Sequence, residues 1–478
     1  MKILKTVDLH DQICNSDSDG WEPSVASGGG VVFYTANYVA GFSHDGGDHF
    51  TQVSPYGLAS NFNLAFCCDQ VVQYIPQIDR FAWLLQTVPD AKNENSYLLA
   101  VASPQAILDD NGALWTTYNL SSSAWFGYSN HWMDYPELAV GDNYLYLEFN
   151  IPDIGKSVIA RLPLSDLAND RLQAAQHFET ELFFARPVQN TGDCGYFGGT
   201  STDSKLLVYS WTEGESDQPT SHEVDIATIP TEDTVSISPS GTDWLGAASK
   251  VRFASLYGAA RSDDELWFAW NGGRRVSGQS VDTFPQPHIG IAVVNRTSFQ
   301  LIEERFLWSA DYAYAYPSLA ANADSEVGIS YAQGGGAEYV EHGVGVLTGK
   351  QELVTTTSGP TVGGGGHYVT IRRAYPNEKF FSAAGYNAPP DKTTSPPSWS
   401  NHPHYVEFGR APCQQWIDKV AVLEVDVKHF QEALDNGEIP PPPQTPERIA
   451  QFRRQLETLK RELQSARASL SACEAENP

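Results

Sequence analysis

The fold class is decided by the stretch Trp132-Met133-Asp134-Tyr135-Pro136-Glu137-Leu138-Ala139-Val140-Gly141-Asp142-Asn143-Tyr144-Leu145-Tyr146-Leu147. It predicts a strand that enters from a polar loop, a tight turn at Gly141-Asp142-Asn143, and a second strand of alternating side chains. The same plan recurs along the chain, so the sequence indicates a fold built from repeats of one small unit.

Seven segments follow this plan, and each can be marked by one residue near the start of the segment. Neighbouring markers are roughly 50 to 70 residues apart, a length that four strands and their loops would fill. Long helical patterns between the strands are missing, which argues against alternating strand–helix units. We therefore predict an all-β fold, a seven-bladed β-propeller, with six or eight blades as alternatives. The markers are Trp21, Cys68, Tyr135, Cys194, Ser255, Tyr316 and His367.

The two ends of the propeller are expected to pair, because a strand from each end in one blade removes two sheet edges and fastens the ring. The last strand pattern before the composition changes is Val420–Val427, and the N-terminal Ile3–Leu9 alternates over most of its length too. We predict that these two segments pair. The predicted domains are a propeller at 1–435, a proline-rich linker at 436–446 and a C-terminal helix at 447–478.

The C-terminal helix carries a seam of apolar residues at alternating steps of three and four, which is an a/d heptad pattern. Thr445-Pro446-Glu447 resembles a helix start, with proline in the first turn. The seam predicts a parallel coiled coil that joins copies of this chain into a homo-oligomer, in which Cys473 could cross-link partners. The alternative is one amphipathic helix docked on its own propeller. The seam consists of Ile449, Phe452, Leu456, Leu459, Leu463, Ala466, Leu470 and Cys473.

The chain has 478 residues and a formal net charge of −28. That charge argues against nucleic acid or an anionic membrane as a partner held by general electrostatics. No apolar run has the length needed to span a membrane, and the N-terminal residues lack the apolar core of a signal peptide. These features predict either a cytoplasmic protein or the mature form of a secreted one.

The six cysteines are too few for a disulfide framework in a chain of this length. None has the paired short spacing of a zinc site. Cys67 and Cys68 are adjacent, and in a regular strand their side chains point to opposite faces of the sheet. We expect them to be poor partners for each other.

Ser43-His44-Asp45-Gly46-Gly47-Asp48-His49-Phe50 follows the pattern Ser-x-Asp-x-Gly-x-x-aromatic. It resembles the Asp box of the sialidase-like, BNR-repeat propellers, with Phe50 where that family usually has Trp. Physically the motif is a β-turn: Asp45 accepts backbone N–H bonds, Gly47 supplies a permissive backbone, and Phe50 packs into the blade. In the family it is a structural turn, so the resemblance bears on the fold and supplies no catalytic residue.

The resemblance also implies a propeller that faces carbohydrate, because the wider superfamily includes glycan lyases, glycosidases and lectins. A sialidase would have three arginines that grip a carboxylate, and an early Arg-Ile-Pro motif. That motif is missing, and the first arginine of this chain is Arg80, inside the second repeat. A typical sialidase is therefore not expected.

The candidate site lies where the repeats begin, because the loops that lead into the innermost strands form one face of a propeller. The residues there combine aromatic rings, which stack on sugars, with polar groups that bind hydroxyls. Each residue also has a structural interpretation, as packing between blades or as a bond at a strand end. The predicted catalytic residues are His131, Tyr135, Asp134, His367 and Arg252. The predicted substrate-binding residues are Trp132, Asp69, Gln70, Tyr257 and Tyr316.

Two reactions fit these residue types. A lyase that acts on a uronate would use Arg252 to neutralise the carboxylate, and a histidine or Tyr135 to move protons. A glycosidase would place two carboxylates, Asp69 and Asp134, beside the scissile bond. We predict a polysaccharide lyase or a glycosidase acting on an acidic glycan, with a non-enzymatic glycan-binding or scaffold propeller as the alternative. Asp69 and Asp134 are equally suited to a structural calcium ion, the one cofactor that the sequence suggests.

Overall fold

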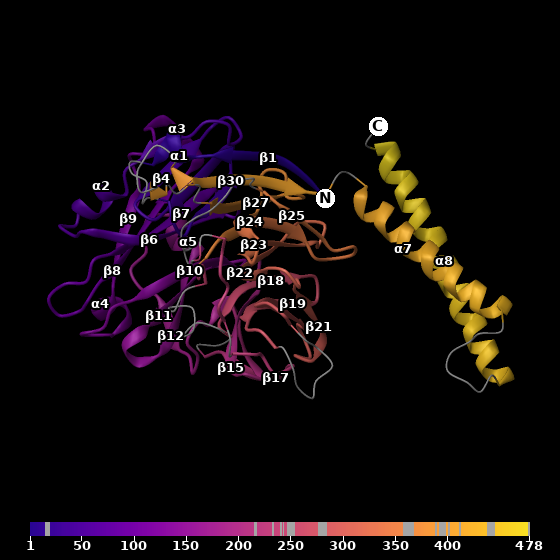
Figure 1. Cartoon of the computed structure of the whole chain (residues 1–478). Coiled ribbons are helices and arrows are strands. Elements are labelled where there is room, and N and C mark those ends of the chain that lie inside the picture. The colour runs from indigo at the N-terminus through magenta and orange to yellow at the C-terminus, as the bar shows by residue number, and fades with distance from the viewer. Residues whose placement is uncertain are drawn as a thin grey trace. The chain divides into compact units, whose positions relative to one another are not determined.

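The strands of the protein form seven four-stranded sheets and one two-stranded hairpin within the described residues. One strand from each of the seven sheets faces the centre, and these innermost strands contact one another in a closed ring. The predicted seven-bladed β-propeller is confirmed (Figure 1). The computed structural model describes residues 1–14, 20–214, 218–231, 234–239, 241, 243–245, 254–275, 284–356, 368–387, 390–391, 398–399, 402–410, 413–436 and 445–476.

The blades follow one another along the chain, and each is given from its innermost to its outermost strand. Blade 1 contains β2 (Ser24–Gly28), β3 (Val31–Ala36), β4 (Val39–Ser43) and β5 (Thr51–Val53), and blade 2 contains β6 (Phe66–Ile75), β7 (Arg80–Thr87), β8 (Ser96–Ala102) and β9 (Thr116–Ser121). Blade 3 contains β10 (Asp134–Val140), β11 (Tyr144–Ile151), β12 (Lys156–Pro163) and β13 (Gln176–Glu179), and blade 4 contains β14 (Arg186–Pro187), β15 (Cys194–Thr202), β16 (Lys205–Thr212) and β17 (Thr220–Asp225). Blade 5 contains β18 (Leu256–Ser262), β19 (Glu265–Gly272), β20 (His288–Asn295) and β21 (Leu301–Leu307), and blade 6 contains β22 (Ala313–Ala321), β23 (Val327–Gly335), β24 (Glu338–Val346) and β25 (Glu352–Thr355). Blade 7 contains β26 (Thr370–Arg373), β27 (Phe381–Asn387), β30 (His402–Gly409) and β1 (Lys2–Asp8).

Short helices and one small hairpin join some of these strands, and two long helices follow the last blade. The helices are α1 (His10–Ile13), α2 (Pro55–Ser60), α3 (Pro104–Asp109), α4 (Ser122–Phe126), η1 (Pro152–Ile154), α5 (Leu164–Ala168), α7 (Gln414–Asn436) and α8 (Pro446–Glu476). The hairpin consists of β28 (Pro390–Asp391) and β29 (Ser398–Trp399).

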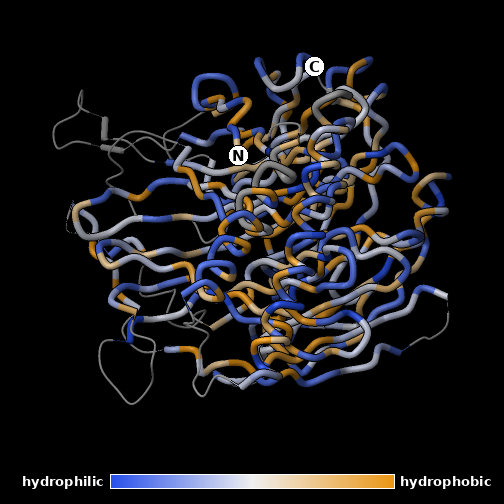
Figure 2. Tube along the Cα trace, turned by 90° about the vertical axis from the view of Figure 1, so that its right-hand side faces the viewer, coloured by the Kyte–Doolittle hydropathy of each residue, from blue (hydrophilic) through white to orange (hydrophobic). Residues whose placement is uncertain are grey.

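The stretch that decides the fold forms β10, a turn and β11, as predicted. β10 ends at Val140 and β11 begins at Tyr144, so the turn is Gly141-Asp142-Asn143. β11 and β12 are buried almost throughout, because neighbouring blades cover both faces of the middle strands, whereas the outermost β13 is mostly exposed. Apolar and polar residues alternate along many of the strands (Figure 2). The core of the propeller therefore lies between its blades.

The turn between β4 and β5 has the geometry predicted for the Ser43–Phe50 motif. The backbone N–H groups of Asp48 and His49 donate to Asp45 Oδ1 at 3.1 and 3.0 Å. Gly47 has a φ of 91°, a conformation that costs glycine little. Phe50 is buried in a cluster with residues of blades 1 and 7. The motif is therefore a structural turn at the edge of blade 1.

The ring is closed by the two ends of the propeller, but not by the pair of segments that the sequence suggested. β1 pairs with β30 in blade 7. The predicted strand Val420–Val427 is wrong, because these residues belong to the helix α7. Val420, Leu423 and Val427 all face one small apolar cluster, so their spacing is that of one helix face. A short apolar run of this kind fits a strand and a helix equally well.

The predicted C-terminal helix is confirmed as α8. Thr445 caps it, since Arg448 N donates to Thr445 Oγ1 at 3.3 Å. The seam, however, packs within the chain: Leu463 and Ala466 are buried in a cluster with Leu423 of α7. The predicted parallel pairing of α8 with a second copy is therefore wrong, because α7 of the same chain occupies the seam.

Cys473, at the end of that seam, is bonded within the chain as well. It forms a disulfide with Cys413, which directly precedes α7. The two long helices are thus antiparallel and are covalently joined at one end. The sequence had suggested that Cys473 could cross-link two copies of the chain. Its bond to Cys413 leaves it unavailable for that role.

The chain divides into two compact units. One comprises residues 3–345 and 353–408, and the other comprises residues 1–2, 346–352 and 409–478. Within the second unit, Glu352 pairs with the amino group of Met1 (2.5 Å) and with Arg410 (3.4 Å), and so links its three segments. None of the described helices combines the length and apolar character that crossing a bilayer requires.

Candidate functional site

The channel of the propeller has two ends, which the innermost strands define. We call the end at which these strands begin the entry end, and the end at which they finish the exit end. Asp69 and Gln70 lie in the first half of β6, and Asp134 and Tyr135 begin β10. Most of the predicted site residues therefore belong to the entry end, as expected.

Five aromatic side chains from four blades and their connecting loops form a continuous wall at the entry end. The ring centroid of Tyr135 lies 4.9 Å from that of Phe184 and 5.1 Å from that of Tyr368. Tyr257 continues the row, 6.2 Å from Phe184 and 5.6 Å from Tyr316. All five belong to one buried cluster. The structure thus brings the predicted residues Tyr135, Tyr257 and Tyr316 together, and we call this row the aromatic wall.

Two members of the aromatic wall have an unusual backbone. The φ angles of Tyr135 and Tyr316 are 58° and 55°, in the left-handed region that bulky residues seldom adopt. Each lies at a register shift of its strand, where a bulge re-aims the side chain. Tyr316 is 1% exposed and its hydroxyl donates to Leu245 O at 3.3 Å. Tyr316 is therefore held by packing and a hydrogen bond, and its role in substrate binding stays a prediction.

Two buried ion pairs lie beside the aromatic wall. Arg186 Nη1 is 3.0 Å from Glu148 Oε2, and the guanidinium lies over the ring of Tyr135 at 4.6 Å. Arg372 Nη2 is 2.5 Å from Glu137 Oε1. Burial raises the pKa of Glu148 to about 7, although the charge of Arg186 lowers it. Both described cations of this region are thus already neutralised by a carboxylate.

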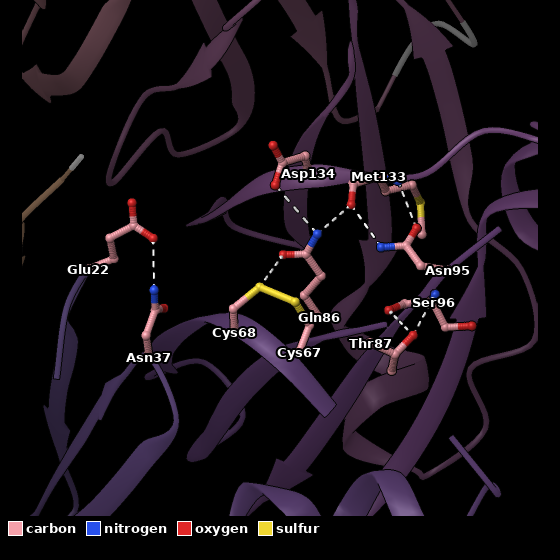
Figure 3. Close-up of a disulfide and its surroundings, with 10 residues drawn as sticks. All are labelled: Glu22, Asn37, Cys67, Cys68, Gln86, Thr87, Asn95, Ser96, Met133 and Asp134. Atoms are coloured by element: carbon pink, nitrogen blue, oxygen red, sulfur yellow. Dashed lines mark hydrogen bonds between the residues drawn. A yellow bond between two sulfur atoms is a disulfide. The ribbon is translucent and has the colours of Figure 1, made fainter. Parts of the chain in front are cut away.

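Cys67 and Cys68 form a disulfide at the start of β6 (Figure 3). The expectation that they would not pair is wrong, because β6 has a register shift at this point and is not a regular strand. Cys68 Sγ lies 3.7 Å from Gln86 Oε1, a contact without a proton, since a disulfide sulfur carries none. Gln86 Nε2 donates to Met133 O at 2.7 Å and reaches Asp134 Oδ1 at 3.5 Å. The disulfide therefore lies next to the amide that positions Asp134.

Carboxylates from three neighbouring blades face this region. Burial raises the pKa of Tyr368, and the charges of Asp69 and Glu22 raise it further. Burial also raises the pKa of Tyr97, with further contributions from Asp134 and Asp69. Asp69 thus shares one electrostatic neighbourhood with Glu22 on one side and Asp134 on the other. Asp69 is 6% exposed, whereas Asp134 is only half-buried.

Two other predicted residues, His131 and Gln70, have partners of their own. His131 Nδ1 lies 3.3 Å from Asp153 Oδ2 of η1, near the surface. Gln70 is fully buried; its amide nitrogen bonds two backbone carbonyls of blade 1 and its oxygen accepts from Trp83 Nε1. Gln70 therefore joins blades 1 and 2, and its role in substrate binding stays a prediction. Trp132 is half-buried between His131 and β10.

Two predicted catalytic residues, Arg252 and His367, lie outside the described residues. Within the part of the chain that is described, no group of three or more His, Cys, Asp or Glu side chains could hold a metal ion. A calcium ion at Asp69 and Asp134 therefore stays a prediction that this geometry does not support.

Arg186 was missed by the sequence analysis because the fourth repeat was placed too late. Its marker, Cys194, lies in β15, the second strand of blade 4. The innermost strand β14 has only two residues, Arg186 and Pro187, too few for any periodicity. One signal was present: Glu148 stands within the otherwise apolar core of β11, where a carboxylate requires a partner.

A cavity of about 640 Å³ opens at the exit end. Its walls are the turns that follow the innermost strands of blades 2 to 7, and none of the predicted site residues lines it. The sequence analysis had no means of finding this cavity, because its residues come from six separate turns.

Solved propellers resemble the chain at low sequence identity. The α-L-arabinofuranosidase Arb93A from Fusarium graminearum, with an iminosugar inhibitor, is 9% identical over 84% of this chain and 98% of its own, with a TM-score of 0.38. An α-L-arabinanase from Penicillium chrysogenum, with arabinobiose, is 8% identical over 86% and 99%, with a TM-score of 0.37. The BP39L lectin from Burkholderia pseudomallei is 10% identical over 80% and 98%, with a TM-score of 0.40. No protein-family model and no curated protein matches the chain.

Proposed function

We propose that the entry end binds a glycan and hydrolyses a glycosidic bond, with Asp69 and Asp134 as the two carboxylates. The observation that carries this proposal is that Asp69 and Asp134 lie near the starts of β6 and β10, the contacting innermost strands of adjacent blades, and both act electrostatically on Tyr97. Aromatic faces bind the apolar side of a sugar ring, and a pair of carboxylates supplies the acid and the base or nucleophile of hydrolysis.

The two carboxylates differ in their surroundings, which suggests how they divide the work. Asp69 is 6% exposed. Asp134 is half-buried and lies near the amide of Gln86. We assign the general acid to the more buried Asp69 and the base or nucleophile to Asp134. Hydrolysis needs two carboxyl groups in different environments, because each has a different role.

Hydrolysis fits the described residues better than the lyase reaction. A lyase must neutralise the carboxylate of a uronate with a cation. The two described arginines of this region, Arg186 and Arg372, already pair with Glu148 and Glu137. The same pairing favours a neutral sugar over the acidic glycan that the sequence suggested, because the two arginines are already paired and the carboxylates of Asp69 and Asp134 would repel an anion.

A second candidate is glycan binding without turnover. It is favoured by the aromatic composition of the wall, since aromatic rings can hold a sugar without any chemistry. In either case the disulfides Cys67–Cys68 and Cys413–Cys473 favour an oxidising compartment.

A glycan array, followed by incubation of each bound glycan with the protein, tests both candidates. Reducing ends report hydrolysis, and absorbance of unsaturated uronates reports a lyase. We expect Asp69→Asn and Asp134→Asn to lower turnover on the order of 100-fold or more while the glycan still binds. The matched control is Asp225→Asn on the exposed outer strand β17, which should behave as the wild type.

Each outcome has a clear meaning. Binding without turnover by the wild type would reject the enzyme and leave a glycan-binding propeller. Turnover that survives both substitutions would reject Asp69 and Asp134 as the reacting groups.

A further inference from the structure

We infer that the exit cavity is a second ligand site, which binds a small neutral saccharide. This inference does not depend on the reaction proposed for the entry end. The cavity measures about 640 Å³ and collects side chains from six blades. A concave site with a few converging polar groups and an aromatic face is the usual form of a small-molecule site.

Arg261 at the end of β18 is the first group that points to a ligand. Its Nη1 donates to Thr191 O at 2.7 Å and its Nε donates to Asp263 O at 3.2 Å. No carboxylate pairs with it among the described residues, and its other N–H groups have no partner there. The guanidinium is therefore held in place by backbone carbonyls, with donors left for a ligand that enters the cavity.

Gln73 near the end of β6 supplies an independent observation. Its side chain is 7% exposed and lines the cavity. The amide nitrogen donates to Tyr74 O at 3.2 Å, but Oε1 has no hydrogen-bond partner within the described structure. A buried acceptor without a partner is costly, so a donor from a ligand in the cavity would stabilise this arrangement.

The backbone beside Arg261 is shaped to leave it room. Gly192 has a φ of 76°, and a Cβ atom there would stand 2.1 Å from Arg261 Nη1. Only glycine permits both the backbone conformation and the position of the guanidinium. A bridge between Gly192 and Gly141 then joins the walls from blades 4 and 3.

The charges of the cavity favour a neutral ligand over an anion. Arg373 is neutralised by Glu378 at 3.1 Å, which leaves Arg261 against the carboxylates of Asp142 and Asp263. An anion would be repelled by both carboxylates and could not donate to the free amide oxygen. A hydroxyl group both donates and accepts, so a sugar can satisfy Gln73 Oε1 and Arg261 together.

An aromatic face completes the site. Tyr375 lines the cavity and is half-buried, and its ring centroid lies 5.3 Å from that of Tyr74. The C–H face of a sugar can stack on such a ring. Tyr375 N donates to Ser27 Oγ at 3.1 Å, which anchors this residue to blade 1.

Titration calorimetry of the full chain with maltose, lactose and cellobiose tests the inference, with glucuronate as the anionic counterpart. We expect a neutral disaccharide to bind with a Kd of about 1 mM. Arg261→Met and Gln73→Leu should each weaken binding about tenfold, whereas Gln73→Glu, which keeps an acceptor, should weaken it less. Asp225→Asn on the exposed outer strand β17 is the matched control and should bind as the wild type does.

Thermal unfolding of each variant shows whether it is folded before binding is compared. Equal binding by the wild type, Arg261→Met and Gln73→Leu would overturn the inference, as would binding of glucuronate alone or of no sugar. Sugar binding that none of the cavity variants weakens would place the sugar outside the exit cavity, and would overturn the second site while leaving the proposed function intact.

Discussion

The two ends of the channel satisfy their polar groups in different ways. At the entry end, charged side chains pair with other side chains and are buried, as in Arg186–Glu148 and Arg372–Glu137. At the exit end, Arg261 donates chiefly to backbone carbonyls of neighbouring turns. The entry end is therefore specified by particular side chains, and the exit end by the blade framework that supplies the carbonyls.

The backbone shows the same difference. Left-handed residues at the exit end lie in turns, as Asp263 does between β18 and β19, where such conformations are usual. At the entry end they are bulky tyrosines inside strands, Tyr135 and Tyr316. Strain of this second kind persists only where the surroundings enforce it, and it is typical of functional sites. The comparison teaches that, of the residues compared, those with a strained backbone inside a strand lie at the entry end.

The largest expected effect is on the free energy of unfolding, and it is measured by breaking one ion pair at each end of the channel. Arg186→Met leaves Glu148 buried without a partner, and we expect a loss of about 3–5 kcal/mol in the free energy of unfolding. Lys379→Met removes the exposed pair with Asp324, 3.5 Å apart, and should cost about 1 kcal/mol or less. Urea unfolding measures both.

Removing both partners is the control for this experiment. Arg186→Met with Glu148→Gln should be more stable than Arg186→Met alone, because no uncompensated charge remains. Equal losses at the two ends would contradict the distinction drawn between buried side-chain pairs and the exposed framework.

A smaller effect concerns pH, because the entry end contains a buried histidine and the exit cavity is lined by none. Burial lowers the pKa of His288, at the start of β20, to about 3. The unfolded chain takes up a proton near pH 6.5 that the folded chain refuses, so stability falls as the pH drops below 6.5.

We expect this histidine to cost about 2 kcal/mol of stability between pH 7.5 and pH 5. Urea unfolding at both pH values should therefore show a smaller decrease for His288→Gln than for the wild type. A parallel decrease in the wild type and His288→Gln would show that this ring takes up a proton equally in the folded and unfolded chains.

The smallest expected effect separates the two disulfides. The double variant Cys67→Ser with Cys68→Ser removes the disulfide that directly precedes Asp69 in the chain and contacts Gln86. We expect glycan turnover to fall about tenfold, equivalent to about 1.4 kcal/mol in the barrier. Cys413→Ser with Cys473→Ser, in the helical pair, should leave turnover unchanged. Identical rates in all three proteins would remove Cys67–Cys68 from the site.

The sequence was sufficient for features that repeat. The turn Gly141-Asp142-Asn143 and its strands recur seven times with variations, so the blade number could be predicted. The same reasoning placed Tyr135, Tyr257 and Tyr316 at one end of the channel. It could not show that these rings are buried against one another, because burial depends on neighbours from other blades.

Other features could not be predicted because they break the repeat. The bulge in β6 lets Cys67 and Cys68 pair, and a bulge has no sequence period. The two-residue strand β14 hid Arg186. The helix α7 was taken for a strand at Val420–Val427, and that error led to a seam of α8 without a partner.

The link between Cys413 and Cys473 changes what a protease can do to the protein. A backbone cut anywhere between α7 and α8 would leave both helices covalently attached to the propeller chain. The cut would be invisible on a denaturing gel without a reducing agent and would appear only after reduction. The two helices are thus part of a closed covalent loop, and the loss of α8 through a cut between them requires two events, one hydrolytic and one reductive.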